Sequence, residues 1–219
     1  LLAPVSIVQG IYAKYYGLAL TTIAAVIVFV RLFDALSDPM IGYLSDRYRD
    51  RTGSYKPIIV SGGLLLIISG YFLYGPPDHV TTVYFSCWFI LFYLGWTLFE
   101  IPHLAWGGEL SGHSTGKTKI YSFRNAAGYS GLVLFYAIPL LPFFDTTEIT
   151  PETLRWSAIA AGLLMLPLLY ECIKRVPDHC GLVYINKPID KNISVEKYQN
   201  GTQNLRLLLD FILHNKPFM

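Results

Sequence analysis

The sequence predicts an all-α membrane protein, a bundle of six transmembrane helices whose first helix is truncated. Of the 219 residues, 53% are hydrophobic and 15% are charged, which is too little charge for the surface of a soluble domain of this size. The charges are clustered, and between them lie apolar runs of about the 20 residues that a helix needs to cross a bilayer. The net charge of +2, without a basic stripe, argues against a nucleic-acid partner.

The first three spans are expected at residues 1–16, 19–43 and 57–75. The first begins in apolar sequence without an initiator Met, so we expect the start of this helix to be missing. Lys14 lies near its outer end, where a lysine anchors a helix at the interface. The second span is apolar except for three charged residues near its middle, and the third contains no charge.

The last three spans are expected at residues 82–108, 121–143 and 154–173. The fourth is long enough to include a tilted or interfacial end. The fifth carries an arginine, Arg124, close to its start, and the sixth ends where the polar tail of the chain begins.

The distribution of lysine and arginine predicts the orientation in the membrane. Most basic residues fall in the segments 44–56, 109–120 and 174–219, whereas the loops 76–81 and 144–153 contain none. Alternating helices place the three basic segments on one side, and cytoplasmic loops are enriched in basic residues. We therefore expect a multi-pass protein of the cell (inner) membrane, with these three segments in the cytoplasm.

Two regions are expected along the chain. Residues 1–175 form the N-terminal bundle of six helices in the bilayer, and residues 176–219 form a cytoplasmic linker. Within this linker, apolar residues gather at 205–212, as in a short amphipathic helix on a membrane surface. Since the chain stops soon after that segment, we expect the linker to lead to a second bundle that this sequence lacks.

The second span contains three ionisable side chains, Arg31, Asp34 and Asp38, within about two helical turns. A charge at mid-membrane costs about 2.5–3.5 kcal/mol, so this face must point into the protein or into water. Arg31 and Asp34 are three residues apart and the two carboxylates four, which places all three on one face. One interpretation is a structural ion pair. The other is a site where the carboxylates hold a proton or a small cation between them.

Two further charges, Glu100 and Arg124, lie within the fourth and fifth spans. With alternating helices these two residues and Asp38 all fall in the cytoplasmic half of the membrane, so that they could meet around one cavity. The alternative for Arg124 is that its side chain reaches up to the interface, because it lies near the start of its helix.

Four segments together resemble one known family of transporters. They are residues 31–47 (RLFDALSDPMIGYLSDR), 51–57 (RTGSYKP), 100–110 (EIPHLAWGGEL) and 122–124 (SFR). This pattern resembles the glycoside–pentoside–hexuronide:cation symporter family of the major facilitator superfamily, over nearly the whole chain but less in the tail. The resemblance implies the N-terminal half of a major facilitator fold, built from two three-helix inverted repeats.

The resemblance also implies a cation site. Asp34 and Asp38 match the carboxylates of the family's second helix, and Ser37 stands where the family has an amide. On the fourth helix Glu100 matches a carboxylate and Thr97 a neighbouring hydroxyl. The coupling ion is expected to be H⁺ or Na⁺, with Asp34, Asp38 and Glu100 as ligands if it is Na⁺, and no other cofactor is expected.

A solute site and a gate follow from the same resemblance. Arg124 matches the arginine of the sugar site, and Arg31 is predicted to be a further solute-binding residue. Leu104 replaces an indole that stacks on the sugar, with Trp106 two residues later. The expected cytoplasmic gate consists of Gly42, Asp46, Arg47 and Arg51.

The function implied is secondary active transport, not enzymatic catalysis. A small polar solute, a sugar or glycoside, would be carried together with the cation by alternating access in the lipid bilayer. Two alternatives remain open at this point. Residues 128–131 match the Gly-x-Ser-Gly of intramembrane serine proteases, although the sixth span carries no histidine to act as a base. A six-helix channel or scaffold is the other.

Overall fold

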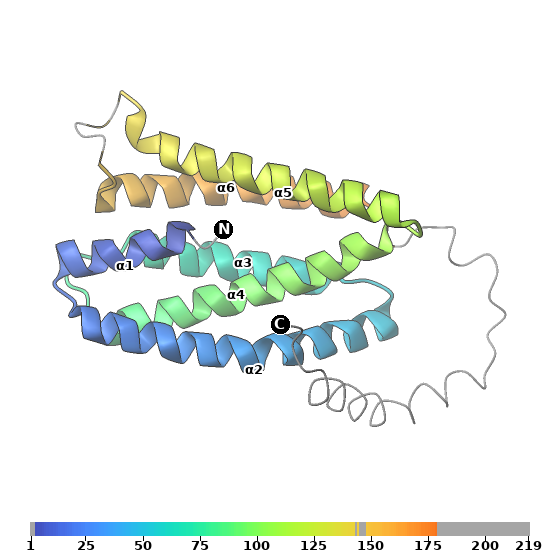
Figure 1. Ribbon diagram of the computed structural model, residues 1–219, viewed down its shortest axis with the longest axis horizontal. Coiled ribbons are helices and arrows are strands. Elements are labelled where there is room, and N and C mark those ends of the chain that lie inside the picture. Colours follow the sequence, from blue (N-terminus) through green and yellow to red (C-terminus); the bar gives the residue numbers. More distant parts are fainter. Residues whose placement is uncertain (1–2, 143, 145–147, 179–219) are drawn as a thin grey trace, which may run out of the picture. The chain divides into compact units, whose positions relative to one another are not determined.

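The computed structural model describes residues 3–142, 144 and 148–178 (Figure 1). These residues belong to one compact unit. The regular elements of the described part are all helices, namely α1 (Ala3–Tyr16), α2 (Leu20–Thr52), α3 (Lys56–Tyr74), α4 (Thr82–Glu109), α5 (Ser114–Ala137), the 3₁₀ turn η1 (Ile138–Leu140) and α6 (Pro151–Arg175). The amphipathic helix expected at 205–212 lies outside the described residues.

Four of these helices, α2, α3, α4 and α6, are long and apolar enough to cross a membrane. The helix α1 has 14 residues, which is short for a span, and α5 begins in polar sequence. The prediction of an all-α membrane protein is therefore confirmed, and each of the six predicted spans corresponds to one helix.

Two predicted boundaries are wrong, because apolar residues mark the part of a helix inside the bilayer and not its end. The helix α2 continues through most of the predicted loop 44–56 to Thr52. It stops at Gly53, whose φ of 81° lies in the left-handed region that favours glycine, and the N–H of Gly53 caps the carbonyl of Arg49 at 2.7 Å. Likewise α5 begins at Ser114, inside the predicted loop 109–120.

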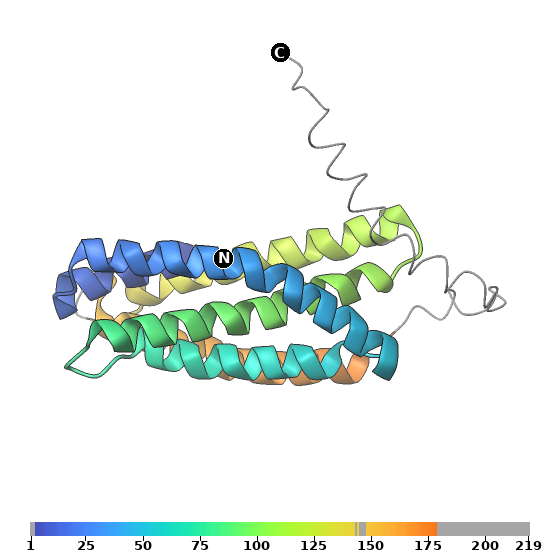
Figure 2. The ribbon, with the colours of Figure 1, turned by 90° about the horizontal axis from the view of Figure 1, so that it is seen from below.

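The closest packing in the bundle is between α3 and α4. Two glycines make it possible, one on each helix. A Cβ atom on Gly62 would lie 2.5 Å from the backbone N of Phe99, and one on Gly95 would lie 2.8 Å from the backbone N of Leu66. The two backbones therefore touch without intervening side chains, as small residues allow in membrane helices. Figure 2 shows α3 running beside α4, and α3 also contacts α6.

An aromatic core joins α1 to this pair of helices. Tyr12 is fully buried, and its ring packs against Phe85 with 4.7 Å between the centroids. Its hydroxyl donates a hydrogen bond to the backbone oxygen of Leu73 at 2.8 Å, which satisfies the polar end of a buried tyrosine. This core lies at the end of the bundle away from the turn between α2 and α3.

Candidate functional site

The polar segment of α2 presents one half-satisfied carboxylate. Nη1 of Arg31 lies 3.8 Å from Oδ2 of Asp34, whose side chain is 16% exposed. Oδ1 of Asp34 is buried and accepts no hydrogen bond from any described residue. A buried acceptor normally has a partner, so this oxygen is the candidate on α2 for binding a ligand.

The other candidates on α2 divide between two environments. Ser37 is 7% exposed, and its hydroxyl donates to the backbone oxygen of Asp34 at 3.4 Å. Asp38 is exposed. The two carboxylates expected on one face are thus unequal, with Asp34 turned further into the bundle. Among the residues described, no group of three His, Cys, Asp or Glu side chains is placed so that it could hold a metal ion. The ligand set of Asp34, Asp38 and Glu100 therefore stays a prediction.

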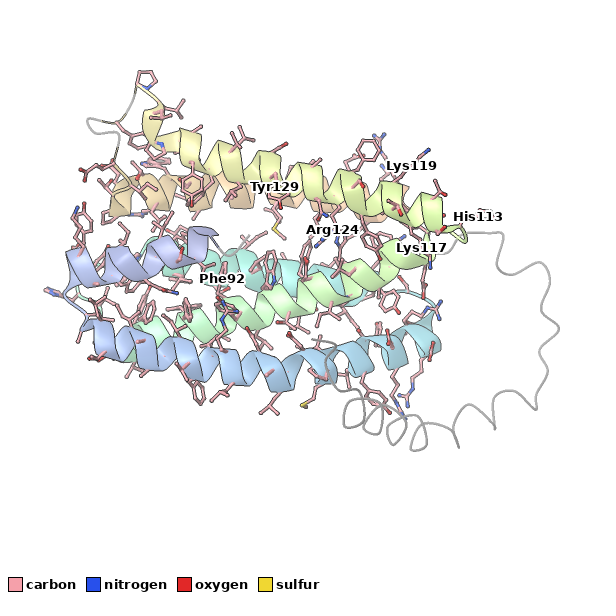
Figure 3. The ribbon with its side chains drawn as sticks, viewed as in Figure 1. Phe92, His113, Lys117, Lys119, Arg124 and Tyr129 are labelled. Atoms are coloured by element: carbon pink, nitrogen blue, oxygen red, sulfur yellow. The ribbon has the colours of Figure 1, made fainter. Side chains whose placement is uncertain are left out.

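Glu100 and Arg124 form an ion pair between α4 and α5. Nη2 of Arg124 contacts Oε1 of Glu100, and both side chains are three-quarters buried or more. Figure 3 shows Arg124 on the side of α5 that faces α4, while Lys117, Lys119 and His113 gather at the start of α5. Arg124 therefore points into the bundle instead of reaching to the interface.

Two buried side chains one helical turn apart lie on one face of α4. Thr97, which the sequence predicted, is 4% exposed. Tyr93, which it did not, is 5% exposed, and the guanidinium carbon of Arg31 lies 5.2 Å from the centroid of its ring. Tyr93 is one helical turn before Thr97, and this i, i+4 spacing is the signal that could have identified it.

Trp106 lies near the α2–α3 turn and uses its polar atom there. It is 2% exposed and packs in a small core with Tyr55 and Ile59. Its indole N–H donates to the backbone oxygen of Pro177 at 3.0 Å, just after α6. The structure therefore occupies the one donor that Trp106 could offer to a solute.

A second polar cluster ties the same turn to the end of α6. Asp178 accepts a hydrogen bond from Oγ of Ser54 at 2.5 Å and pairs with Nζ of Lys56 at 3.2 Å. The Lys56 ammonium also lies over the ring of Trp106, 5.6 Å from its centroid. Side chains from the turn and from α4 therefore hold the residues that follow α6.

Of the expected gate residues, Asp46 has the most specific contact, since it accepts a hydrogen bond from the Tyr55 hydroxyl at 2.9 Å. Burial, followed by this hydrogen bond, raises the pKa of Tyr55, so that its hydroxyl remains a donor at physiological pH. Arg47 donates to the Tyr43 hydroxyl at 3.1 Å, and Arg51 is exposed.

One ion pair near the expected gate residues was missed by the sequence analysis. Arg49 pairs with Glu109 at the end of α4 across 2.8 Å, and so links α2 to α4. Gly42, expected at the gate, faces α4 closely, since a Cβ atom there would lie 3.9 Å from Cγ2 of Ile101.

Comparison with known sequences identifies the family. A family model described as "MFS/sugar transport protein" matches residues 6–179. The chain belongs to this family. Membership confirms the predicted major facilitator fold and a class of transport proteins, not enzymes. No solved structure matches the chain.

Curated relatives of this family are named as symporters and permeases. An "Uncharacterized symporter YnaJ" of Bacillus subtilis is 24% identical over 92% of this chain and 45% of its own length. A "Putative glycoside/cation symporter YagG" of Escherichia coli is 26% identical over 74% of this chain and 36% of its own. A "Lactose permease" of Lactobacillus helveticus is 22% identical over 96% and 33%. The chain thus spans less than half the length of these family members.

The role of Trp106 in this family member is testable by stability. We expect Trp106→Phe to keep the ring in its core but to remove the N–H, which leaves the Pro177 carbonyl without this donor and lowers stability by about 1 kcal/mol. Thermal unfolding of the complete protein in detergent measures the change. Trp156→Phe is the matched control, because Trp156 is 54% exposed. Equal unfolding temperatures for the two variants would contradict the assignment.

Proposed function

We propose that this chain supplies the cation site and part of the solute site of a cation-coupled symporter. The observation that carries the proposal is the buried, unpartnered Oδ1 of Asp34. An anionic oxygen without a partner in a membrane is costly, and a proton or Na⁺ is the smallest ligand that removes the cost. The coupling ion is H⁺ or Na⁺, with the hydroxyls of Ser37 and Thr97 as neighbouring oxygen ligands if it is Na⁺.

The charge balance supports one monovalent cation. In the middle parts of the helices lie three carboxylates, at Asp34, Asp38 and Glu100, but only two guanidinium groups, at Arg31 and Arg124. Glu100 is matched by Arg124, and Arg31 lies beside one oxygen of Asp34. Uptake of one H⁺ or Na⁺ would therefore bring this part of the protein to neutrality.

The solute in this proposal is a small polar molecule, a sugar or glycoside. The Glu100–Arg124 pair offers a charged acceptor beside a charged donor, the combination that binds neighbouring hydroxyl groups well. The names of relatives, a glycoside/cation symporter and a lactose permease, support a sugar. Arg31, whose side chain is 51% exposed, is the second candidate donor.

Coupling follows if cation and solute each bind better when the other is present. Linkage makes this effect reciprocal, so a cation gradient can drive the solute uphill through alternating access. In this proposal the segments 44–56, 109–120 and 174–219 lie on the cytoplasmic side of the cell (inner) membrane. The gate on that side is closed by Gly42, Asp46, Arg47 and Arg51, with the ion pair of Arg49 and Glu109 as a further part of it.

The test is solute-driven cation uptake by the complete protein in proteoliposomes. Lactose and a panel of glycosides are the solutes, and wild type is compared with Asp34→Asn and Asp38→Asn. Asn keeps the shape of the side chain but carries no charge, so we expect Asp34→Asn to lose accumulation while it retains solute exchange at equilibrium. Because Asp38 is exposed, Asp38→Asn should be affected less. Full coupled transport by Asp34→Asn would rule out this cation site.

A further inference from the structure

Arg31 lies between two partners, the carboxylate of Asp34 and the ring of Tyr93. Its Nη1 is 3.8 Å from Oδ2 of Asp34, and its guanidinium carbon is 5.2 Å from the centroid of Tyr93. The first contact joins neighbouring turns of α2, whereas the second crosses from α2 to α4. Arg31 is therefore held by a residue outside its own helix.

The ion pair of Arg31 and Asp34 has one long contact where the two groups could make two hydrogen bonds. A guanidinium group can bind both oxygens of a carboxylate with two parallel hydrogen bonds, and this arrangement is the strongest available to it. Here only one nitrogen approaches one oxygen, at a distance longer than a hydrogen bond, and Oδ1 of Asp34 has no partner among the described residues. The same guanidinium group lies over the face of the Tyr93 ring, where the electron-rich surface attracts a cation.

The ring of Tyr93 is itself fixed. It is 5% exposed, and it packs against Phe89 with 5.0 Å between the centroids and edge-on against Phe92 at 6.4 Å. A ring packed in this way presents one face to Arg31. The position of the guanidinium group is therefore set by the core of α4.

We infer that Tyr93 is a positioning residue that keeps Arg31 from closing on both oxygens of Asp34, so that Oδ1 remains available to the coupling cation. The inference rests on the proposed function, because it assigns to Asp34 the cation described above. Without the ring, Arg31 closes on the carboxylate and competes with H⁺ or Na⁺ for it.

Three variants separate this role from simple packing. Tyr93→Phe keeps the aromatic face and should bind the cation as wild type does. Tyr93→Leu removes the face, and the apparent affinity for the cation should fall about five- to tenfold. In an Arg31→Gln background the same Tyr93→Leu change should have no effect, since a neutral amide cannot compete for Asp34. Lost packing alone would weaken binding in both backgrounds.

The experiment uses the purified complete protein without solute. Binding of radioactive Na⁺ is measured at constant pH, and proton uptake is measured with an indicator dye at constant Na⁺. Asp34→Asn identifies the coupling ion, as the one whose binding it abolishes, and the Tyr93 variants are compared for that ion. Tyr93→Met, which fills more of the space, replaces Tyr93→Leu if the latter does not fold.

The outcomes separate the two proposals. Wild-type affinity in Tyr93→Leu, or an equal loss in the Arg31→Gln background, overturns the inference while the cation site stands. If Asp34→Asn changes the binding of neither ion, the proposed function fails first, and the inference with it. The expected result has three parts. Tyr93→Leu lowers the affinity for the cation, and Tyr93→Phe keeps the wild-type affinity. In the Arg31→Gln background, Tyr93→Leu has no effect.

Discussion

Replacing Gly62 with alanine is expected to destabilise the bundle by about 3 kcal/mol, because the new methyl group has no space. Its Cβ would lie 2.5 Å from the backbone N of Phe99 and 2.6 Å from the backbone carbon of Leu98. Backbone atoms of a helix cannot rotate away as a side chain can, so α3 and α4 must separate. Thermal unfolding in detergent and the yield of monodisperse protein measure the effect.

The chain provides matched controls for this substitution. No heavy atom lies within 4 Å of a Cβ built on Gly128 or on Gly131 in α5. We expect Gly128→Ala and Gly131→Ala to keep or raise stability, by up to about 1 kcal/mol, because alanine favours a helix interior over glycine. Gly95→Ala, on the other side of the α3–α4 contact, should resemble Gly62→Ala. If Gly62→Ala unfolds at the same temperature as Gly131→Ala, the close approach of the two helices is incorrect.

Removal of one partner of the Glu100–Arg124 pair is expected to be the most damaging change of charge. Arg124→Gln leaves the carboxylate of Glu100 in a partly buried place without its cation, which costs about 3–5 kcal/mol. Transport should fall below detection, because the same guanidinium group is the proposed solute donor. The double variant Glu100→Gln/Arg124→Gln should recover most of the stability but none of the transport. Unfolding in detergent and solute exchange in proteoliposomes measure the two effects separately.

The pair of Lys14 with Glu148 is the control for burial. Its atoms lie 3.6 Å apart, but the side chains are 65% and 73% exposed. An exposed ion pair contributes little to stability, so Lys14→Gln should leave unfolding unchanged. A loss in Lys14→Gln as large as that in Arg124→Gln would mean that burial does not set the strength of these pairs.

Most of the fold could be predicted from the sequence, but the helix ends could not. The limits of α3 and α4 agree closely with the apolar runs, since those helices end where the runs end. In α2 the backbone stays helical through charged residues as far as Thr52, just before Gly53. A hydropathy pattern identifies apolar stretches and so cannot predict a helix that continues into charged sequence. A glycine after Arg49 and Arg51 is a recognised helix stop, and it is the better signal for this end.

The site was predictable to the extent that charge reveals it. Asp34, Glu100 and Arg124 stand out in apolar sequence, and the structure shows that the last two are paired. The contact of Arg31 with Tyr93 and the burial of Trp106 depend on which helix faces which, and one sequence does not contain that information. A membrane helix contains many aromatic residues, and the sequence does not distinguish the one that contacts Arg31 from the others.

The surplus carboxylate has an electrical consequence. With three carboxylates and two guanidinium groups in the middle of the helices, the empty bundle carries one negative charge there and the cation-loaded bundle carries none. Moving one charge across 100 mV changes the energy by about 2.3 kcal/mol. Under the proposed function we therefore expect membrane voltage to act on the charge of this bundle when its site is empty and not when its site is loaded. In a cell with a negative interior, voltage would push the empty site toward the outer face, where the proposed mechanism has the next cation bind.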